Sequence, residues 1–326
     1  MLTLILFFIL IIPVQIVQTR QIIKESSIEI PSEFRWNERK INLIFTCNVK
    51  NIGNETIDME AYIAKPRNLE NQEIIGDIFY DPEPNGFDMD RWGQEVAIFN
   101  YILLPDQKIT LSYELNASIY TIRYFLFPWK IKGEIPKEIL DKYTADDTLY
   151  KINDTYIQDI VKDVIGNTKN ILFKAIKLHD YVINNLEYYN NWYWDDAVTT
   201  FKRGNGSCSD YCFAYIALCR AAGIPARYKG GTLLNSRMPY TDIFFHRIVE
   251  IYLPGYGWVP VDPTFNDFQH LFRHFFFGYI SNNLFVLTVG GGSSEFLGWS
   301  YHYWYKNSSQ DRNITTDCNM KWNNIL

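Results

Sequence analysis

The chain of 326 residues is poor in cysteine and carries no surplus of positive charge. Five cysteines are too few for a scaffold built on disulfides, and because the number is odd, at least one thiol is free within the chain or paired with another molecule. Lysine and arginine number 31 against 37 aspartates and glutamates, a net charge of −6, whereas a nucleic-acid-binding protein usually has a basic surplus. The composition therefore argues against a disulfide-rich module and against a nucleic-acid partner.

Long hydrophobic runs are also scarce, and the one that is present opens the chain. Residues 1–14 are apolar except for Thr3, and the run is shorter than the roughly 20 residues that cross a bilayer. It is typical of a secretory signal peptide, with an uncleaved N-terminal anchor as the alternative, since no basic residue precedes it and no clear cleavage site follows. We expect residues 1–20 to direct the protein to an extracellular or cell-surface location, with attachment to a membrane through this segment left open. Six Asn-x-Ser/Thr sequons agree with export.

Hydrophobic residues make up 47% of the chain, which suffices for packed cores and excludes a disordered protein. At roughly 150 residues per domain, the length predicts two domains. Between residues 27 and 130, alternating apolar runs separated by turn residues predict a β-sandwich-like domain over residues 21–130. The strands expected there cover residues 43–49, 60–63, 96–104, 108–115 and 120–127. Cys47 lies on the apolar face of the first strand, where we expect a small buried side chain.

After Pro128 the spacing of apolar residues changes to that of helices. Helices are predicted over residues 157–164 and 168–186, and a third from Cys208 to about Ala222. Residues 131–326 therefore form the second predicted domain. The first domain has no recognisable reactive cluster, so we expect the chemistry in the second.

The start of the third predicted helix has the residues of a capped N-terminus. Ser207 and Ser209 are both suitable N-caps, and Asp210 belongs in a first turn. Cys208 is therefore placed where free N–H groups and a partial positive charge favour thiolate over thiol. The same N–H groups can hold a developing oxyanion. This position predicts a nucleophilic cysteine.

A thiolate nucleophile needs a base that maintains it and later donates a proton. His246 lies near the start of a predicted strand over residues 244–252, and a turn connects this strand to a second one over residues 258–264. Paired as a hairpin, the two strands would bring Asp262 beside His246. A carboxylate there fixes the imidazole tautomer and stabilises the imidazolium. We expect Cys208, His246 and Asp262 to form a catalytic triad.

Four ordered motifs surround these residues: G-x-C-x-D-Y, R-A-x-G-I-P-A-R, H-x-x-x-E and G-W-V-P-V-D-P-T. Together they resemble the transglutaminase-like superfamily, and the similarity covers about residues 170–266. The matching positions are Gly206, Cys208, Asp210, Tyr211, Arg220, Gly223, Ile224, Pro225, Arg227, His246, Glu250, Gly257, Trp258, Asp262 and Thr264. The chain departs from the family at Ile248, where members often have Trp two residues after the histidine.

The resemblance implies a papain-related α+β core, in which the helix that carries the cysteine packs on an antiparallel sheet. It also implies the triad of Cys208, His246 and Asp262 and a protein or peptide substrate. Family activities include glutamine–lysine crosslinking, deamidation, peptide or amide hydrolysis and, in some members, no catalysis. Three functions therefore stay open: thiol-dependent acyl transfer or hydrolysis at carboxamide or peptide bonds, a cysteine peptidase with the same triad, and a non-catalytic cell-surface binding module.

The resemblance further implies a second oxyanion donor from an upstream side chain. The aromatic loop over residues 188–194 offers Tyr188, Trp192 and Trp194, which are candidates for that donor or for a substrate wall. The triad requires no cofactor. Some relatives are regulated by calcium, but the sequence has no D-x-[DN]-x-[DN]-G loop, so neither a cofactor nor a metal is expected.

The remaining cysteines have simpler interpretations. Cys212 and Cys219 share a helix face with Cys208, but Cys219 lies about 16 Å along the helix, too far for a shared metal. Both are therefore expected to pack in the core. Cys318, in a polar tail, is either free or paired with another thiol.

Two further groups of side chains are expected to be structural. His270 and His274 have the i, i+4 spacing of a zinc-binding pair, but no third ligand is evident, so a surface or packing role is expected. Arg227 and Asp210 are expected to form an ion pair or a helix cap.

Overall fold

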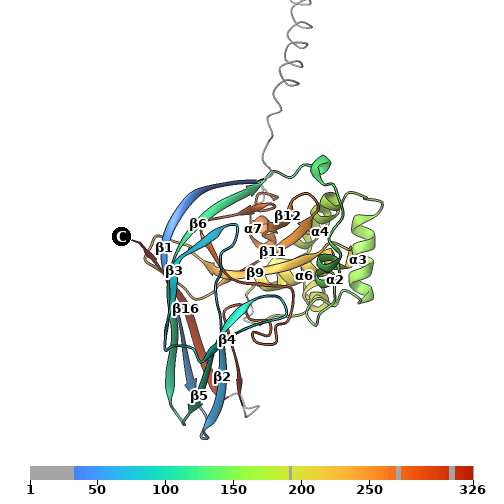
Figure 1. Ribbon diagram of the computed structural model, residues 1–326. Coiled ribbons are helices and arrows are strands. Elements are labelled where there is room, and N and C mark those ends of the chain that lie inside the picture. Colours follow the sequence, from blue (N-terminus) through green and yellow to red (C-terminus); the bar gives the residue numbers. More distant parts are fainter. Residues whose placement is uncertain (1–32, 191–192, 269–272, 308–312, 326) are drawn as a thin grey trace, which may run out of the picture. The chain divides into compact units, whose positions relative to one another are not determined.

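The computed structural model describes residues 33–190, 193–268, 273–307 and 313–325, and Glu33–Leu326 form one compact unit. Trp192, His270 and the predicted export segment lie outside the described residues. The fold is of the α+β class, as the sequence predicts: antiparallel sheets precede a core of helices packed on a further sheet (Figure 1). None of the helices in the described ranges combines the length and the hydrophobicity of a membrane span.

Two antiparallel sheets contain the N-terminal strands. The first has the order β10-β16-β1-β6-β13, and β3 also pairs with β6. Its strands are β1 (Glu33–Asn51), β3 (Gln72–Asp81), β6 (Lys108–Tyr124), β10 (Tyr240–Asp242), β13 (Tyr279–Ile280) and β16 (Ile314–Asn324). The second sheet, β15-β2-β5-β4, consists of β2 (Ile57–Ala64), β4 (Gly86–Met89), β5 (Glu95–Leu103) and β15 (Tyr303–Asn307). Alternate residues of β1 from Ile41 to Val49 are buried, so its core face follows the period of two that the sequence shows.

These sheets differ from the predicted strands in their long-range pairing. The expected strands 108–115 and 120–127 are joined in one strand, β6, which ends at Tyr124 and pairs with β1 on both sides of a register shift near residue 120. The strands β15 and β16, near the C-terminal end of the chain, complete the two sheets. Pairing between segments so far apart leaves no local pattern in the sequence. The domain boundary near residue 130 stays a prediction.

A disulfide joins Cys47 of β1 to Cys318, its cross-strand neighbour in β16. Cys47 is buried, as expected, but its sulfur also crosslinks two strands of one sheet, which the packing interpretation did not include. Cys318, which the sequence left as either free or paired, is therefore paired within the chain. Cys208, Cys212 and Cys219 are the free thiols.

The helices gather around the sheet β12-β11-β9-β14 (Figure 1). Its strands are β9 (Ala226–Leu233), β11 (His246–Leu253), β12 (Gly257–Val261) and β14 (Leu284–Gly290), and β7 (Glu187–Tyr188) and β8 (Asn205–Gly206) form a short parallel pair. The helices are η1 (Pro128–Lys130), α2 (Lys137–Tyr143), α3 (Thr155–Ile165), α4 (Ile171–Asn185), α5 (Ala197–Arg203), α6 (Cys208–Ala221) and α7 (Pro263–Phe268). Because α6 packs against β9 and β11 and is also contacted by α3, α4 and α5, it is buried along almost its whole length. The predicted helix that starts at Cys208 and packs on an antiparallel sheet is confirmed.

Candidate active site

Cys208 is the first residue of α6, and the cap predicted in front of it is present. The Ser207 backbone N–H donates to Asp210 Oδ2 over 2.7 Å, and the Ser207 hydroxyl donates to the same oxygen over 2.8 Å. A Cβ at Gly206 would lie 2.5 Å from Asp210 Cβ, so the turn into the helix requires glycine. These contacts confirm the capping role expected of Asp210 and fix the point at which Cys208 enters the helix.

His246 opens β11, and Asp262 follows β12, its hairpin partner. His246 Nε2 lies 2.7 Å from Asp262 Oδ2, and both residues are buried, with exposures of 5% and 4%. The backbone N–H of Phe265 donates to the other carboxylate oxygen, Oδ1, over 3.0 Å. The hairpin therefore brings Asp262 beside His246, as the sequence predicts, and α7 holds the carboxylate from the other side.

The charges of Cys208 and His246 support each other. Burial raises the pKa of Cys208, but hydrogen bonding and charge from His246, together with the backbone N–H of Arg247, outweigh it and lower the pKa below the ordinary value. Burial lowers the pKa of His246, but the charge of Asp262 and the contact with Cys208 outweigh it and raise the pKa. Both shifts favour a thiolate–imidazolium pair, which is the reactive form of a cysteine nucleophile.

Cys208 opens into a cavity of about 270 Å³. The residues that line it are Tyr188, Asn190, Trp194, Ser207, Cys208, Ser209, Ile243, Phe244, Phe245, Tyr301, His302, Thr316 and Cys318. This set contains Tyr188 and Trp194, two of the candidates for an oxyanion donor or a substrate wall, and contains no Asp, Glu, Lys or Arg. Burial and the nearby charge of Arg247 lower the pKa of His302 to about 4, so its imidazole is neutral at ordinary pH. The described lining of the cavity is therefore uncharged apart from the charge that Cys208 carries when its thiol ionises.

Arg247 is a feature of the site that the sequence reasoning missed. Its side chain is fully buried, and the guanidinium carbon lies 4.6 Å from the centre of each of four aromatic rings, which belong to Trp194, Phe213, Tyr228 and Tyr301. Nη2 donates to the Trp299 carbonyl over 2.6 Å, while Nε and Nη1 have no hydrogen-bond partner among the described residues. A cation buried among aromatic rings, close to Cys208 and without a carboxylate partner, adds positive potential that favours the thiolate form.

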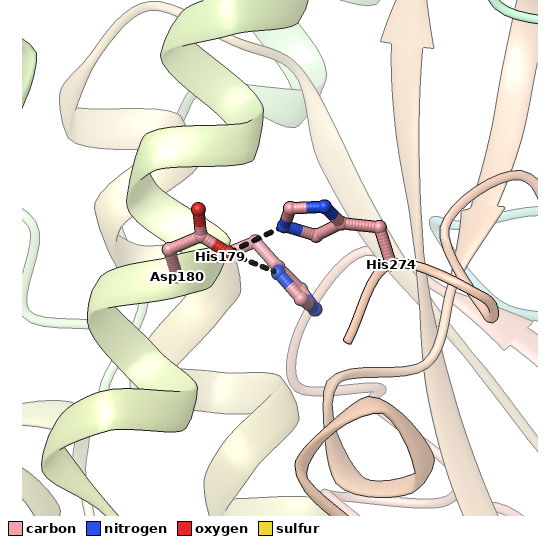
Figure 2. Close-up of side chains that lie close together, drawn as sticks. All are labelled: His179, Asp180 and His274. Carbon is pink, nitrogen blue, oxygen red and sulfur yellow. Dashed lines mark hydrogen bonds and ion pairs between the residues drawn. The ribbon is translucent and has the colours of Figure 1, made fainter. Parts of the chain in front are cut away.

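The other side chains singled out in the sequence lie away from the cavity. Cys212 and Cys219 are buried in α6, as expected, and Arg227 pairs with Glu250 over 2.8 Å, which confirms its structural role. His274 lies 2.6 Å from Asp180 in α4, whose neighbour is His179 (Figure 2). The sequence reasoning missed this partner because α4 is remote along the chain.

Comparisons with known proteins agree with the arrangement of this core. Residues 158–263 match the profile of the transglutaminase-like superfamily. An uncharacterised protein of Haemophilus influenzae is 30% identical over 132 residues, which are 33% of this chain and 36% of that protein. A Pseudomonas aeruginosa protein named protein-glutamine gamma-glutamyltransferase is 38% identical over 71 residues, which are 20% of this chain and 11% of that protein. The chain thus spans about a third or less of these relatives.

A solved structure extends the likeness to most of the chain. The crystal structure described as "a Putative Cysteine Protease from Cytophaga hutchinsonii" superposes with a TM-score of 0.62 at 17% sequence identity, and the match covers 88% of this chain and 92% of that one. At this identity the likeness shows a shared fold. The sequence profile gives the likeness to the transglutaminase-like superfamily core over residues 158–263, and the shared fold extends beyond these residues.

Proposed function

We propose that the protein is a thiol-dependent acyl-transfer enzyme that acts on carboxamide or peptide bonds of protein substrates. The observation that carries the proposal is the arrangement of Cys208, His246 and Asp262: a thiol at a helix N-terminus whose pKa is lowered by His246, and an imidazole that is in turn fixed by a buried carboxylate. This arrangement supplies a nucleophile, an acid and base, and an orienting group at one end of an uncharged cavity.

The proposed reaction has two steps. Cys208 Sγ attacks the carbonyl carbon, and the C–N bond breaks as His246 gives its proton to the leaving amine, which leaves a thioester on Cys208. An amine or a water molecule then attacks the thioester while His246 removes its proton, which restores the thiolate and the imidazolium. Free N–H groups in the first turn of α6 would hold the oxyanion of each step, with Tyr188 and Trp194 as candidates for a further donor.

The acyl acceptor decides between the two enzyme classes. The name of the Pseudomonas aeruginosa relative supports transfer to an amine, whereas the name given to the Cytophaga hutchinsonii structure supports a cysteine peptidase. Both use the same triad, because water and amines differ only in the second step. We favour acyl transfer or hydrolysis at carboxamides and keep the peptidase as the alternative.

One incubation separates these functions. The purified protein is mixed with a glutamine-rich protein such as casein, with and without a labelled primary amine, and the products are analysed by mass spectrometry. Amine incorporation supports acyl transfer, deamidation supports amide hydrolysis, and backbone cleavage supports the peptidase. Absence of all three products, with Cys208 reacting no faster than a free thiol, would overturn the enzyme proposal and favour a binding module.

We also propose that the protein works outside the cytoplasm. The apolar start of the sequence and the sequons support this location, and so does the Cys47–Cys318 disulfide, because disulfides persist in oxidising compartments. Fractionation of cells that express the tagged full chain tests the proposal. Recovery in the cytoplasm with both cysteines reduced would contradict it.

A further inference from the structure

Asn266 connects the triad to a buried histidine that the proposed mechanism does not use. Its side chain is fully buried, and its backbone N–H donates to the Asp262 carbonyl over 3.1 Å. Its side-chain oxygen, Oδ1, accepts the Phe276 backbone N–H over 2.7 Å, and the Phe276 carbonyl accepts the Asp262 backbone N–H over 3.1 Å. Asn266 and Phe276 therefore hold the backbone of Asp262 through hydrogen bonds that the triad itself does not contain.

The remaining group of Asn266, the side-chain amide nitrogen Nδ2, lies 2.9 Å from Nε2 of His179. Because Oδ1 already accepts from Phe276, the amide cannot flip, and Nδ2 must donate to Nε2. A neutral imidazole that accepts at Nε2 carries its proton on Nδ1. Burial lowers the pKa of His179, which keeps the ring in this neutral form.

The other side of His179 faces a cluster with Asp180 and His274 (Figure 2). Asp180 Oδ1 lies 3.4 Å from His179 Nδ1 and 2.6 Å from His274 Nε2. These three side chains could offer one ligand atom each to a metal ion. The tautomer argues against that use, because Nδ1 of His179 carries a proton and has no lone pair for a metal. The carboxylate is instead the shared acceptor of two imidazole N–H groups.

The charged groups around His179 oppose one another: Asp180 raises its pKa, whereas His274 and Arg273 lower it, so burial decides for the neutral ring. Asp180 lies on its own helix, and His274 and Arg273 face it from the segment after α7. From α6, the ring of Tyr215 lies edge-on at 5.8 Å. Protonation of His179 would place an N–H at Nε2 against the N–H of the Asn266 side-chain amide. The neutral ring is therefore the form that keeps the hydrogen bond.

We propose that His179 is a positioning residue for the triad, and that it acts through Asn266. Nε2 of His179 fixes the Asn266 amide, and the amide fixes Phe276 and the backbone of Asp262, from which the carboxylate reaches His246. The proposal rests on the proposed function of the triad. It assigns a function to a buried histidine that lies 87 residues from its partner along the chain.

Two substitutions at His179 test the role of its acceptor. The His179→Leu variant removes the acceptor and leaves the Asn266 amide N–H without a partner. The His179→Gln variant offers a side-chain oxygen near the place of Nε2. We expect His179→Leu to lose about 100-fold in turnover, the size of effect that a small misplacement of a catalytic group causes. We expect His179→Gln to keep most of the turnover of the unaltered protein.

The pH dependence of Cys208 alkylation by iodoacetamide separates a positioning role from a merely structural one. Without a fixed Asp262 the pKa of His246 falls, the imidazolium supports the thiolate less, and the His179→Leu alkylation profile moves to higher pH. Asn51→Leu is the matched control: Asn51 is fully buried and donates to the backbone carbonyls of Glu55 and Leu103, far from the triad along the chain, so its loss lowers stability without moving the profile.

The alkylation profile also keeps this test separate from the proposed function, because it reports on the triad even if no substrate is turned over. A folded His179→Leu variant with an unchanged profile would overturn the proposal, as would a His179→Gln variant as impaired as His179→Leu. Nitrogen NMR of the unaltered protein covers the case in which His179→Leu does not fold. We expect His179 as the Nδ1–H tautomer, unchanged by added Zn²⁺; the Nε2–H tautomer or a zinc-dependent shift would contradict the assignment.

Discussion

The first residue of α6 and the interior of the same helix place cysteines in opposite chemical states. At the N-terminus, contact with His246 outweighs the effect of burial, and the pKa of Cys208 is lowered. Further along the helix, burial dominates, and the pKa values of Cys212 and Cys219 are raised above the ordinary range. All three thiols belong to one helix, so the difference comes from the cap, the imidazole and the cavity at its N-terminal end. The reactivity of a cysteine in this helix therefore depends on its position and not on its residue type alone.

The largest effect is expected when the thiol at the N-terminus is removed. Cys208→Ala should abolish thioester formation and turnover while the protein stays folded, because the side chain lies at the edge of a cavity and the cap at Ser207 and Asp210 remains. Mass spectrometry of the trapped acyl-enzyme and a thermal melt check both parts. Turnover close to that of the unaltered protein would contradict the assignment of Cys208, since the nucleophile would then lie elsewhere.

The next largest effect is expected at the carboxylate. Asp262→Asn keeps the shape of the side chain but removes the charge that orients His246, and we expect a loss of about 10⁴-fold in turnover. The pKa of His246, followed by NMR, should fall towards the ordinary value of histidine. A loss of less than about tenfold would show that Asp262 does not fix the imidazole.

A smaller effect is expected at the buried cation. Replacing Arg247 by Met removes positive charge beside the thiolate, so Cys208 should need a higher pH to ionise and should react roughly tenfold more slowly near neutral pH. The Arg220→Met variant is the control, because Arg220 is also buried beside an aromatic ring, that of Tyr150. Equal alkylation profiles in the two variants would show that the charge of Arg247 does not lower the pKa of Cys208.

The smallest effect is expected in the interior of the helix. Cys219→Ala should lower the free energy of unfolding by about 1 kcal/mol through lost packing, and it should leave the alkylation of Cys208 unchanged. Denaturant unfolding and the alkylation rate are the two measurements. A change in that rate would mean that the interior thiol takes part in the chemistry.

The sequence predicts the triad because each of its members lies in a local pattern. Cys208 follows a turn and starts a helix, and His246 and Asp262 belong to one hairpin. The features that the sequence reasoning missed are formed by side chains from separate elements. The Cys47–Cys318 disulfide spans 271 residues, and the rings around Arg247 come from four different segments. Such contacts depend on how strands and helices pack, and no short motif encodes them.

The pH dependence of cysteine alkylation in the unaltered protein tests the central claim most directly. The lowered pKa of Cys208 means that its thiolate forms below the ordinary pH of a thiol and is lost only as the pH falls through that lowered value, while the raised pKa of His246, about 10, keeps the imidazolium up to alkaline pH. Iodoacetamide with peptide mapping should therefore modify Cys208 fast at neutral pH and leave Cys212 and Cys219 unmodified in the folded protein. A Cys208 that reacts only near the pH of a free thiol, or no faster than the two interior cysteines, would contradict the account.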